Sequence, residues 1–195
     1  MWDERYNTEE FVYGSQPNDF LASVSGQIPR GRVLCLAEGE GRNAVYLAQL
    51  GHQVLAVDKS GVGLAKAERL AEASGVRIET RVVDLAHFIF APGNWDAVVS
   101  IFAHVPSALR KALHRGVVAG LRSGGVFVLE AYTPAQLKLK TGGPPDADML
   151  MSLSSLRQEL AGLEFRHALE QERDVLEGKL HTGRGAVVQV LAVKP

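Results

Sequence analysis

The chain has 195 residues, a length that suits one globular domain with its own hydrophobic core. Apolar residues make up 46% of the chain and charged residues 22%, which are ordinary values for a folded protein and exclude wholesale disorder. The formal net charge of -1 gives no concentrated basic surface, so nucleic acid and anionic membranes are not expected partners. Cys35 is the only cysteine, which excludes an intramolecular disulfide and a cysteine-rich zinc site.

The N-terminal and apolar segments bear on where the protein works. Residues 1–5 are charged and lack the basic and apolar stretches of a signal peptide. No apolar run approaches the roughly 20 residues that a membrane-spanning helix needs. We therefore expect one domain over residues 1–195, located in the cytoplasm.

From residue 32 onward, short apolar runs typical of buried strands alternate with helical segments. The predicted strands are residues 33–36, 53–58, 77–83, 95–101 and 125–130. The predicted helices are one that starts at Asn18, one at 43–50, one that Ser60 caps, and one after Pro106. This alternation predicts a parallel sheet with helices on both faces.

The C-terminal part departs from the alternation. A helix at about 153–163 is followed by two strand-like segments, 165–174 and 186–193, with a glycine-containing connection between them. That connection is short for a helical crossover, so the two segments are predicted to pair antiparallel. The predicted fold class is therefore α/β: a doubly wound, Rossmann-like, mostly parallel sheet that ends in an antiparallel C-terminal hairpin.

A glycine-containing turn follows the first predicted strand. Gly39 and Gly41 let a ligand approach the backbone there, and the first amides of the next helix point toward such a ligand. Asp58 ends the second predicted strand, nineteen residues after Gly39, where a carboxylate can accept both hydroxyls of a ribose. The pattern predicts a nucleotide-type ligand site, with a tight strand–helix connection as the alternative interpretation.

Two cofactors fit this pattern. The spacing Gly39-x-Gly41-x-x-Ala44 matches a dinucleotide fingerprint, so an NAD(P)-dependent oxidoreductase is one interpretation. S-adenosylmethionine needs the same adenosine site but has no pyrophosphate, and its carboxylate would bind the turn amides. The five strands and the hairpin use the whole chain and leave no separate substrate domain, which favours S-adenosylmethionine.

Several longer stretches support that choice. They are Trp2-x-x-Arg5-Tyr6, Tyr13-Gly14, Pro17-Asn18-x-Phe20-Leu21, Glu38-Gly39-Glu40-Gly41-Arg42-Asn43 and Ala56-Val57-Asp58. With them the chain resembles, over nearly its whole length, the class I S-adenosylmethionine-dependent methyltransferases, and among these the tellurite-resistance and thiopurine-type small-molecule methyltransferases. The resemblance implies a seven-stranded sheet with the last strand antiparallel, and methyl transfer to a small molecule.

The resemblance also implies where the cofactor binds. Contacts are expected at the first turn, at Asp58, and after the third and fourth strands, where Asp84 would hold the adenine amino group or, alternatively, cap a short helix. The expected cofactor-binding residues are Glu38, Gly39, Gly41, Arg42, Asn43, Asp58, Lys59, Asp84, Leu85 and Ser100. No metal is expected, because the histidines show no ligand spacing.

Two positions depart from the family pattern. Cys35 stands where relatives carry an acid, and Ala37 stands where they carry a glycine. Alanine is expected to hold the turn to ordinary backbone angles. We hypothesise that Glu38 supplies the displaced carboxylate to the ammonium group of the cofactor. A non-catalytic S-adenosylmethionine-binding protein is the alternative that these departures leave open.

The acceptor is expected at the same edge of the sheet. The candidate catalytic bases are His104, after the fourth strand, and Glu130, at the end of the fifth. Soft nucleophiles such as thiols, selenium or tellurium species would need little help from a base. Phe102 and Tyr132 are expected to shape the acceptor pocket.

Two segments are predicted to border the acceptor. Residues 1–26 would form an aromatic lid in which Trp2, Tyr6 and Tyr13 contact the sulfonium or the acceptor, or else anchor the arm to the core. Residues 134–149 would form an acceptor-side loop. The expected partner is a small-molecule acceptor, with no nucleic acid and no membrane.

Overall fold

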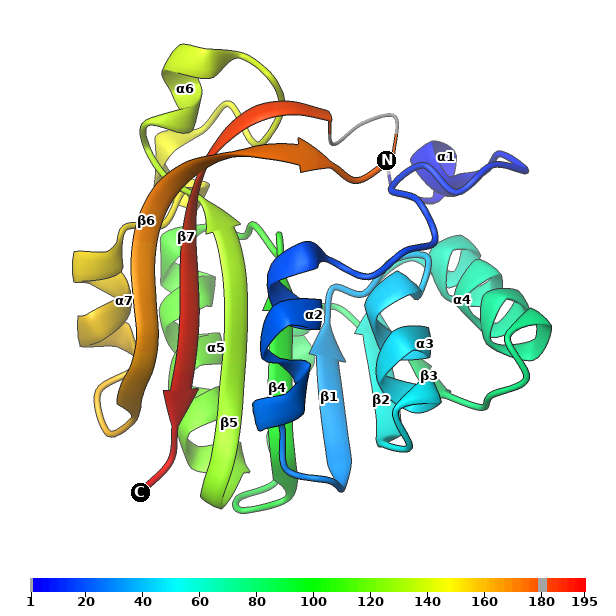
Figure 1. Ribbon diagram of the computed structural model, residues 1–195, viewed down its shortest axis with the longest axis horizontal. Helices are drawn as coiled ribbons and strands as arrows, with labels where there is room; N and C mark the ends of the chain where they lie inside the picture. The colour runs from blue at the N-terminus through cyan, green and yellow to red at the C-terminus, as the bar shows by residue number, and fades with distance from the viewer. Residues whose placement is uncertain (1, 179–181) are drawn as a thin grey trace.

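The structure, a computed structural model, describes residues 2–178 and 182–195. Within them a seven-stranded sheet has the order β3-β2-β1-β4-β5-β7-β6 (Figure 1). Neighbouring strands from β3 to β5 are parallel, whereas β7 is antiparallel to both β5 and β6. The strands are β1 (Arg32–Leu36), β2 (Gln53–Asp58), β3 (Glu79–Val82), β4 (Trp95–Ile101), β5 (Leu121–Tyr132), β6 (Glu164–Leu176) and β7 (Thr182–Val193).

The helices follow the alternation that the sequence predicts. The α-helices are α1 (Trp2–Tyr6), α2 (Asp19–Val24), α3 (Arg42–Gln49), α4 (Gly61–Ala73), α5 (Ser107–Gly120), α6 (Gln136–Leu139) and α7 (Leu153–Glu159). The 3-10 turns are η1 (Ser25–Gln27), η2 (Leu85–His87) and η3 (Ala147–Met149). No helix in the described part of the chain combines the length and the apolar character that crossing a bilayer would require.

Helices cover both faces of the sheet, as expected for a doubly wound fold. In β1, Val33 and Cys35 belong to a core cluster with residues of α2, α3 and α4, whereas Leu34 and Leu36 belong to a second cluster with residues of α5 and α7. Alternate side chains of a strand point to opposite faces, so burial of both sets requires a helical layer on each side. Figure 1 shows α2 and α3 in front of the sheet and α5 behind it.

Local signals predicted several boundaries correctly. The predicted bounds of β2 and β4 are those observed. The side chain of Asn18 caps α2, and the side chain of Ser60 caps α4 by accepting from the amide of Gly63 at 3.0 Å. Gly51 follows the end of α3 with a φ of 89°, a left-handed conformation that suits glycine after a helix.

The C-terminal hairpin is longer than predicted. Strands β6 and β7 continue past the carboxyl end of β5 and curve over the N-terminal arm, here defined as residues 2–16 (Figure 1). A Cβ on Gly178 would lie 2.5 Å from backbone atoms of Tyr13 and Gly14, so only glycine permits this close approach. The arm and the hairpin thus meet above the carboxyl edge of the parallel strands.

Candidate active site

A cavity of ≈ 470 Å³ lies at the carboxyl edge of the sheet, a usual ligand position in such folds. Its lining comes from the residues that follow β1, β2, β3 and β4, with the N-terminal arm above them. The predicted site residues that line it are Trp2, Tyr6, Tyr13, Glu38, Arg42, Asn43, Asp58, Lys59, Asp84, Leu85, Phe102 and His104. The predicted site residues outside its lining are Gly39, Gly41, Ser100, Glu130 and Tyr132.

Asp58 stands at the end of β2 with its carboxylate fixed by the backbone. One oxygen accepts from the amide of Gly39 at 2.9 Å, and the other accepts from the amide of Ser60 at 2.8 Å. Burial raises the pKa of Asp58 above its ordinary value. Each oxygen keeps a lone pair after its amide bond, so a carboxylate held this rigidly can still accept from a diol in the cavity.

Glu38 occupies the amino end of α3. Its Oε1 accepts from the amides of Asn43 at 3.0 Å and Ala44 at 2.8 Å. The protein therefore supplies its own carboxylate to these two helix amides, and the expected binding of the cofactor's carboxylate to the turn amides stays a prediction. Burial outweighs these hydrogen bonds and raises the pKa of Glu38 to about 7.

The turn glycines serve packing. Gly39 and Gly41 have φ values of 61° and 90°, which an L side chain rarely adopts. A Cβ on Gly39 would lie 2.5 Å from the hydroxyl of Tyr6, and one on Gly41 would lie 2.4 Å from the Cβ of Ala67. Both positions therefore need glycine so that Tyr6 and helix α4 can pack, and a contact of Gly39 and Gly41 with the cofactor stays a prediction.

Ala37 corrects another expectation. Its φ is 50°, in the left-handed region, so alanine does not hold this turn to ordinary angles. The same conformation recurs at Phe102, with a φ of 52°, directly after the neighbouring strand β4. Both residues line the cavity, and backbone strain of this kind commonly collects at functional sites.

The third and fourth strands contribute the remaining predicted cofactor positions. Asp84 caps η2 by accepting from the amide of Ala86 at 2.9 Å and also lines the cavity, so both interpretations of this residue fit its position. The ammonium nitrogen Nζ of Lys59 lies 3.9 Å from Oδ2 of Asp84. Ser100 is buried within β4, and the cavity begins at the next residue, Ile101.

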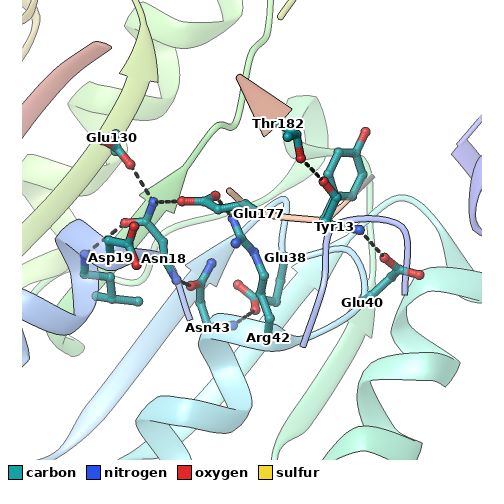
Figure 2. Close-up of polar contacts among 12 residues, drawn as sticks. Tyr13, Asn18, Asp19, Glu38, Glu40, Arg42, Asn43, Glu130, Glu177 and Thr182 are labelled. Carbon is teal, nitrogen blue, oxygen red and sulfur yellow. Dashed lines mark hydrogen bonds and ion pairs between the residues drawn. The ribbon is translucent and has the colours of Figure 1, made fainter. Parts of the chain in front are cut away.

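Glu130 lies away from the cavity in a buried polar network, of which Figure 2 shows the contact with Asn18. Its fully buried carboxylate accepts from both Nε and Nη2 of Arg173, at 2.8 and 2.7 Å, and from Gln189 at 2.7 Å. Asn18 also donates to it. The prediction that Glu130 acts as a base is corrected, because four donors occupy its two carboxylate oxygens and leave no lone pair to take a proton from the molecule that is methylated.

Glu177 connects this network to the cavity. Its carboxylate accepts from Arg173 at 2.8 Å. It also accepts from Asn18 at 2.7 Å and forms an ion pair with Arg42 (Figure 2). The two arginines hold the pKa of Glu177 below its ordinary value despite its burial. Arg42 lines the cavity, so the end of the C-terminal hairpin is fixed directly to the cofactor turn.

His104 lines the cavity, but both of its ring nitrogens bind the backbone. Nε2 accepts from the amide of Tyr132 at 3.3 Å, and Nδ1 lies 3.0 Å from the carbonyl oxygen of Met149. The proton therefore sits on Nδ1, which donates to that carbonyl. Burial lowers the pKa of His104 to about 4, so the ring is neutral at pH 7.

Phe102 and Tyr132 pack around this histidine. The rings of His104 and Tyr132 are stacked with centroids 5.7 Å apart, and the centroids of Phe102 and Tyr132 are 4.7 Å apart. Tyr132 is 1% exposed and supports the cavity wall from behind. Of the predicted loop at 134–149, Met149 lines the cavity, and the segment contains α6 and η3.

The aromatic arm covers the cavity. The rings of Trp2 and Tyr6 are stacked with their centroids 5.8 Å apart. The ring of Tyr6 meets that of Tyr13 edge-on, with the centroids 6.1 Å apart. Asp3 accepts from the hydroxyl of Ser60 at 2.5 Å, which fixes the arm to the start of α4. The lid predicted at 1–26 includes residue 1, which lies outside the described residues.

A buried lysine, missed from the sequence, anchors the same arm. Lys66 in α4 is 2% exposed and donates to the carbonyl oxygens of Thr8 at 3.0 Å and Glu10 at 2.6 Å. It also forms an ion pair with Glu40, whose other oxygen accepts from the amide of Tyr13 at 3.2 Å. Its two carbonyl partners lie more than fifty residues away in the chain, so no local pattern marks it.

Comparisons with known proteins agree with this geometry. A family model described as a methyltransferase domain matches residues 33–125, from β1 into β5. An uncharacterized methyltransferase, YbaJ of Bacillus subtilis, is 28% identical over 200 residues, covering 93% of this chain and 73% of that protein. These likenesses support a class I S-adenosylmethionine-dependent methyltransferase. Its cofactor is S-adenosylmethionine.

Two further proteins are similar to this methyltransferase. The 2-heptyl-1-hydroxyquinolin-4(1H)-one methyltransferase of Mycobacteroides abscessus is 25% identical over 136 residues, covering 68% of this chain and 57% of that protein. The crystal structure of TehB from Haemophilus influenzae superposes with a TM-score of 0.75 at 20% identity, covering 100% of this chain and 66% of that chain. The second likeness confirms the seven-stranded, mostly parallel fold with its antiparallel C-terminal strands.

The cavity suits this cofactor electrostatically. Of the described residues that line it, the acidic ones are Glu38, Glu40, Asp58 and Asp84, and the basic ones are Arg42 and Lys59. Each basic group has an acidic neighbour, Glu177 or Asp84 respectively. An excess of carboxylates favours a ligand with a sulfonium and an ammonium charge. Asp58 would hold the ribose hydroxyls there, and the aromatic arm would cover the sulfonium.

Proposed function

We propose that this methyltransferase acts on a small molecule whose attacking atom is a soft nucleophile: a thiol, or a selenium or tellurium species. The observation that carries the proposal is the state of the two expected bases. His104 has both nitrogens bound to the backbone, and Glu130 is enclosed by Arg173, Asn18 and Gln189. An acceptor that is already ionised at neutral pH needs neither of them, whereas an alcohol would need a placed base.

Methyl transfer from a sulfonium makes modest demands on the protein. When bound, the cofactor supplies an electrophilic methyl group, and an anionic nucleophile attacks it in line as charge disperses. Water around the nucleophile slows such a reaction, so exclusion of water and alignment of the two partners are the main tasks of the site. The arm residues Trp2, Tyr6 and Tyr13 supply the cover, and the strand ends supply the alignment.

The size of the cavity supports a small acceptor. Its ≈ 470 Å³ must hold the cofactor and the acceptor together, and ligand cavities for one small molecule commonly span ~300–1,000 Å³. The net charge of -1 offers no attraction to nucleic acid or to an anionic membrane. The name of the Mycobacteroides abscessus relative, a heptyl-hydroxyquinolinone methyltransferase, also points to a small acceptor. We expect the enzyme to work in the cytoplasm.

Labelled S-adenosylmethionine and an acceptor panel test this function. We expect methylation of thiols and selenols and no methylation of the matching alcohols. His104→Asn should change kcat less than tenfold and leave its pH profile intact, because the imidazole takes no proton from the acceptor. A loss of roughly 100-fold or more, typical of removing a general base, would contradict the proposal.

Two further outcomes would replace the proposal. Binding of NAD(P) in preference to S-adenosylmethionine would favour an oxidoreductase. Tight binding of S-adenosylmethionine without turnover of any acceptor in the panel would favour a cofactor-binding protein that does not catalyse.

A further inference from the structure

The cavity has two chemically distinct halves. The cofactor half, at the ends of β1, β2 and β3, contains all the acidic and basic residues that line the described cavity. The acceptor half follows β4 and α5 and consists of residues 101–106 with Leu109 and Met149. Its one titratable side chain among the described residues is His104.

The acceptor half is held in an uncharged state by its hydrogen bonds. Nε2 of His104 must keep its lone pair to accept from the Tyr132 amide, and Nδ1 must keep its proton to donate to Met149. A second proton on the ring would break the first of these bonds. Since both nitrogens point at the backbone and Tyr132 is stacked against the ring, the imidazole presents mainly carbon atoms to the cavity.

A buried ion pair fixes the wall that holds His104. Arg110 is 5% exposed and donates through Nη1 to the carbonyl oxygens of Asp148 at 3.0 Å and Leu150 at 3.3 Å, the residues on either side of Met149. Glu159 accepts from Nε and Nη2 of Arg110 at 2.9–3.2 Å. The Met149 carbonyl is therefore held in place from both sides, and the guanidinium charge is neutralised behind the wall.

We propose that the acceptor half selects molecules whose body is uncharged and apolar, and that it rejects acceptors that carry a further negative charge, oxyanions included. This inference rests on the proposed function and narrows its acceptor class. Among the described residues that line the cavity, the two cations, Arg42 and Lys59, lie in the cofactor half beside Glu177 and Asp84. A carboxylate or oxyanion bound after β4 would lose its hydration, meet no cation of this described lining and face the carboxylates of the other half.

The experiment uses thiols that differ by one carboxylate. Benzenethiol is compared with 4-mercaptobenzoate, and 4-methylbenzenethiol with 4-mercaptophenylacetate, because aromatic thiols ionise near neutral pH; selenite and tellurite represent oxyanions. We expect kcat/KM to be at least tenfold higher for the uncharged member of each pair, and no methylation of the oxyanions. Equal or higher kcat/KM for the carboxylated thiols, or methylation of tellurite, would overturn the inference.

A charge placed in the acceptor half gives the reciprocal test. Leu109 lines this half from α5 and is partly exposed, so a lysine there can reach the acceptor. Leu109→Lys should reverse or abolish the preference within each thiol pair, whereas Leu109→Gln, of similar length and without charge, should leave it. An unchanged preference in a folded Leu109→Lys enzyme would show that charge does not decide the selection.

The outcomes separate this inference from the proposed function. If no thiol is methylated, the proposed function fails, and binding of each thiol pair to the enzyme saturated with S-adenosylhomocysteine, measured by calorimetry, still tests the selection. If both members of a pair are methylated equally, the proposed function stands and the inference fails.

Discussion

The carboxylate of Glu38 accepts a hydrogen bond from the backbone amide of Ala44 at 2.8 Å, across the turn between β1 and α3. The same carboxylate lines the cofactor cavity. It therefore caps a helix and borders the cavity at once. Because burial raises its pKa to about 7, its charge changes in the range of pH where the enzyme is handled.

The stability of the ligand-free enzyme should depend on pH because the pKa of Glu38 is raised. The folded state binds the Glu38 proton more tightly than the unfolded state, so this residue stabilises the fold at acidic pH. The contribution is lost as the pH rises from the ordinary value of 4.5 through about 7. Glu38→Gln cannot titrate and should flatten the fall of Tm between pH 4.5 and 7.5. Glu72→Gln, an exposed position of α4, is the control and should leave the curve as in the wild type.

Cofactor affinity should show the opposite trend with pH. If Glu38 binds the ammonium group of S-adenosylmethionine, ligand binding requires the ionised carboxylate. The affinity should then rise as the pH passes about 7, with release of a proton, and Glu38→Gln should bind more weakly without that rise. Calorimetry in buffers of different ionisation enthalpy measures both quantities. An affinity unchanged by Glu38→Gln would leave the residue as a helix cap alone.

Ala37 offers a stabilising substitution. Its φ of 50° costs an L residue roughly 1–2 kcal/mol, and glycine adopts that conformation freely but loses more entropy on folding. Ala37→Gly should therefore raise the free energy of unfolding by about 0.5–1 kcal/mol. Ala112→Gly, at an exposed site inside α5, should lower it by a similar amount. Urea unfolding of the three proteins decides the sign, and a destabilised Ala37→Gly would show that the methyl group matters more than the strain.

Sequence reasoning succeeded here where the cause is local. Ser60 and Asn18 cap helices within three residues of themselves, so their roles follow from short patterns. The acid at the end of β2, Asp58, follows from strand order and glycine spacing. These signals gave the α/β class, the edge of the sheet that holds the cavity, and most of the residues that line it.

Sequence reasoning failed where partners come from distant parts of the chain. Glu130 lies near the carboxyl end of β5, as a catalytic acid can, but Arg173 reaches it from β6, on the far side of β7. Lys66 pairs with an arm about sixty residues earlier. Ala37 shows a different limit, because propensity cannot tell when packing forces a residue into a strained conformation.

Glu159 should carry much of the acid sensitivity of the enzyme. Its hydrogen bonds to His114 and Arg110 outweigh burial and lower its pKa to about 2. The ionised carboxylate therefore stabilises the fold above the ordinary value of 4.5, and that stabilisation is lost as the pH falls from 4.5 through about 2. Glu159→Gln should lower stability at pH 7 by about 3 kcal/mol, since Arg110 would remain buried without its anion.

The same variant should respond less to acid. Unfolding curves for the wild type and Glu159→Gln should converge as the pH falls toward 2, because protonation removes the same charge. Glu164→Gln, in an exposed ion pair with Arg166, should change stability by less than about 1 kcal/mol. Curves that remain parallel from pH 7 to pH 2 would contradict the assigned role of Glu159.

Lys66 should control how the arm covers the cofactor. Its ammonium group is the buried cation that binds the Thr8 and Glu10 carbonyls and pairs with Glu40. Lys66→Met removes those bonds and leaves the Glu40 carboxylate buried without a cation, which should cost roughly 3–5 kcal/mol of stability. Cofactor affinity should fall with it, because Tyr6 and Tyr13 would lose their anchor above the cavity.

A double variant distinguishes the effect of Lys66 on the arm from its effect on the stability of the fold. Lys66→Met with Glu40→Gln removes both charges, so most of the lost stability should return, while the arm still lacks its lysine. We therefore expect Tm to recover and the affinity for S-adenosylmethionine to remain at least tenfold weaker than in the wild type. Limited proteolysis should cut residues 2–16 faster in this variant, and added S-adenosylhomocysteine should protect them only partly. Wild-type affinity in a double variant of recovered Tm would mean that the lysine stabilises the fold and that the arm closes without it.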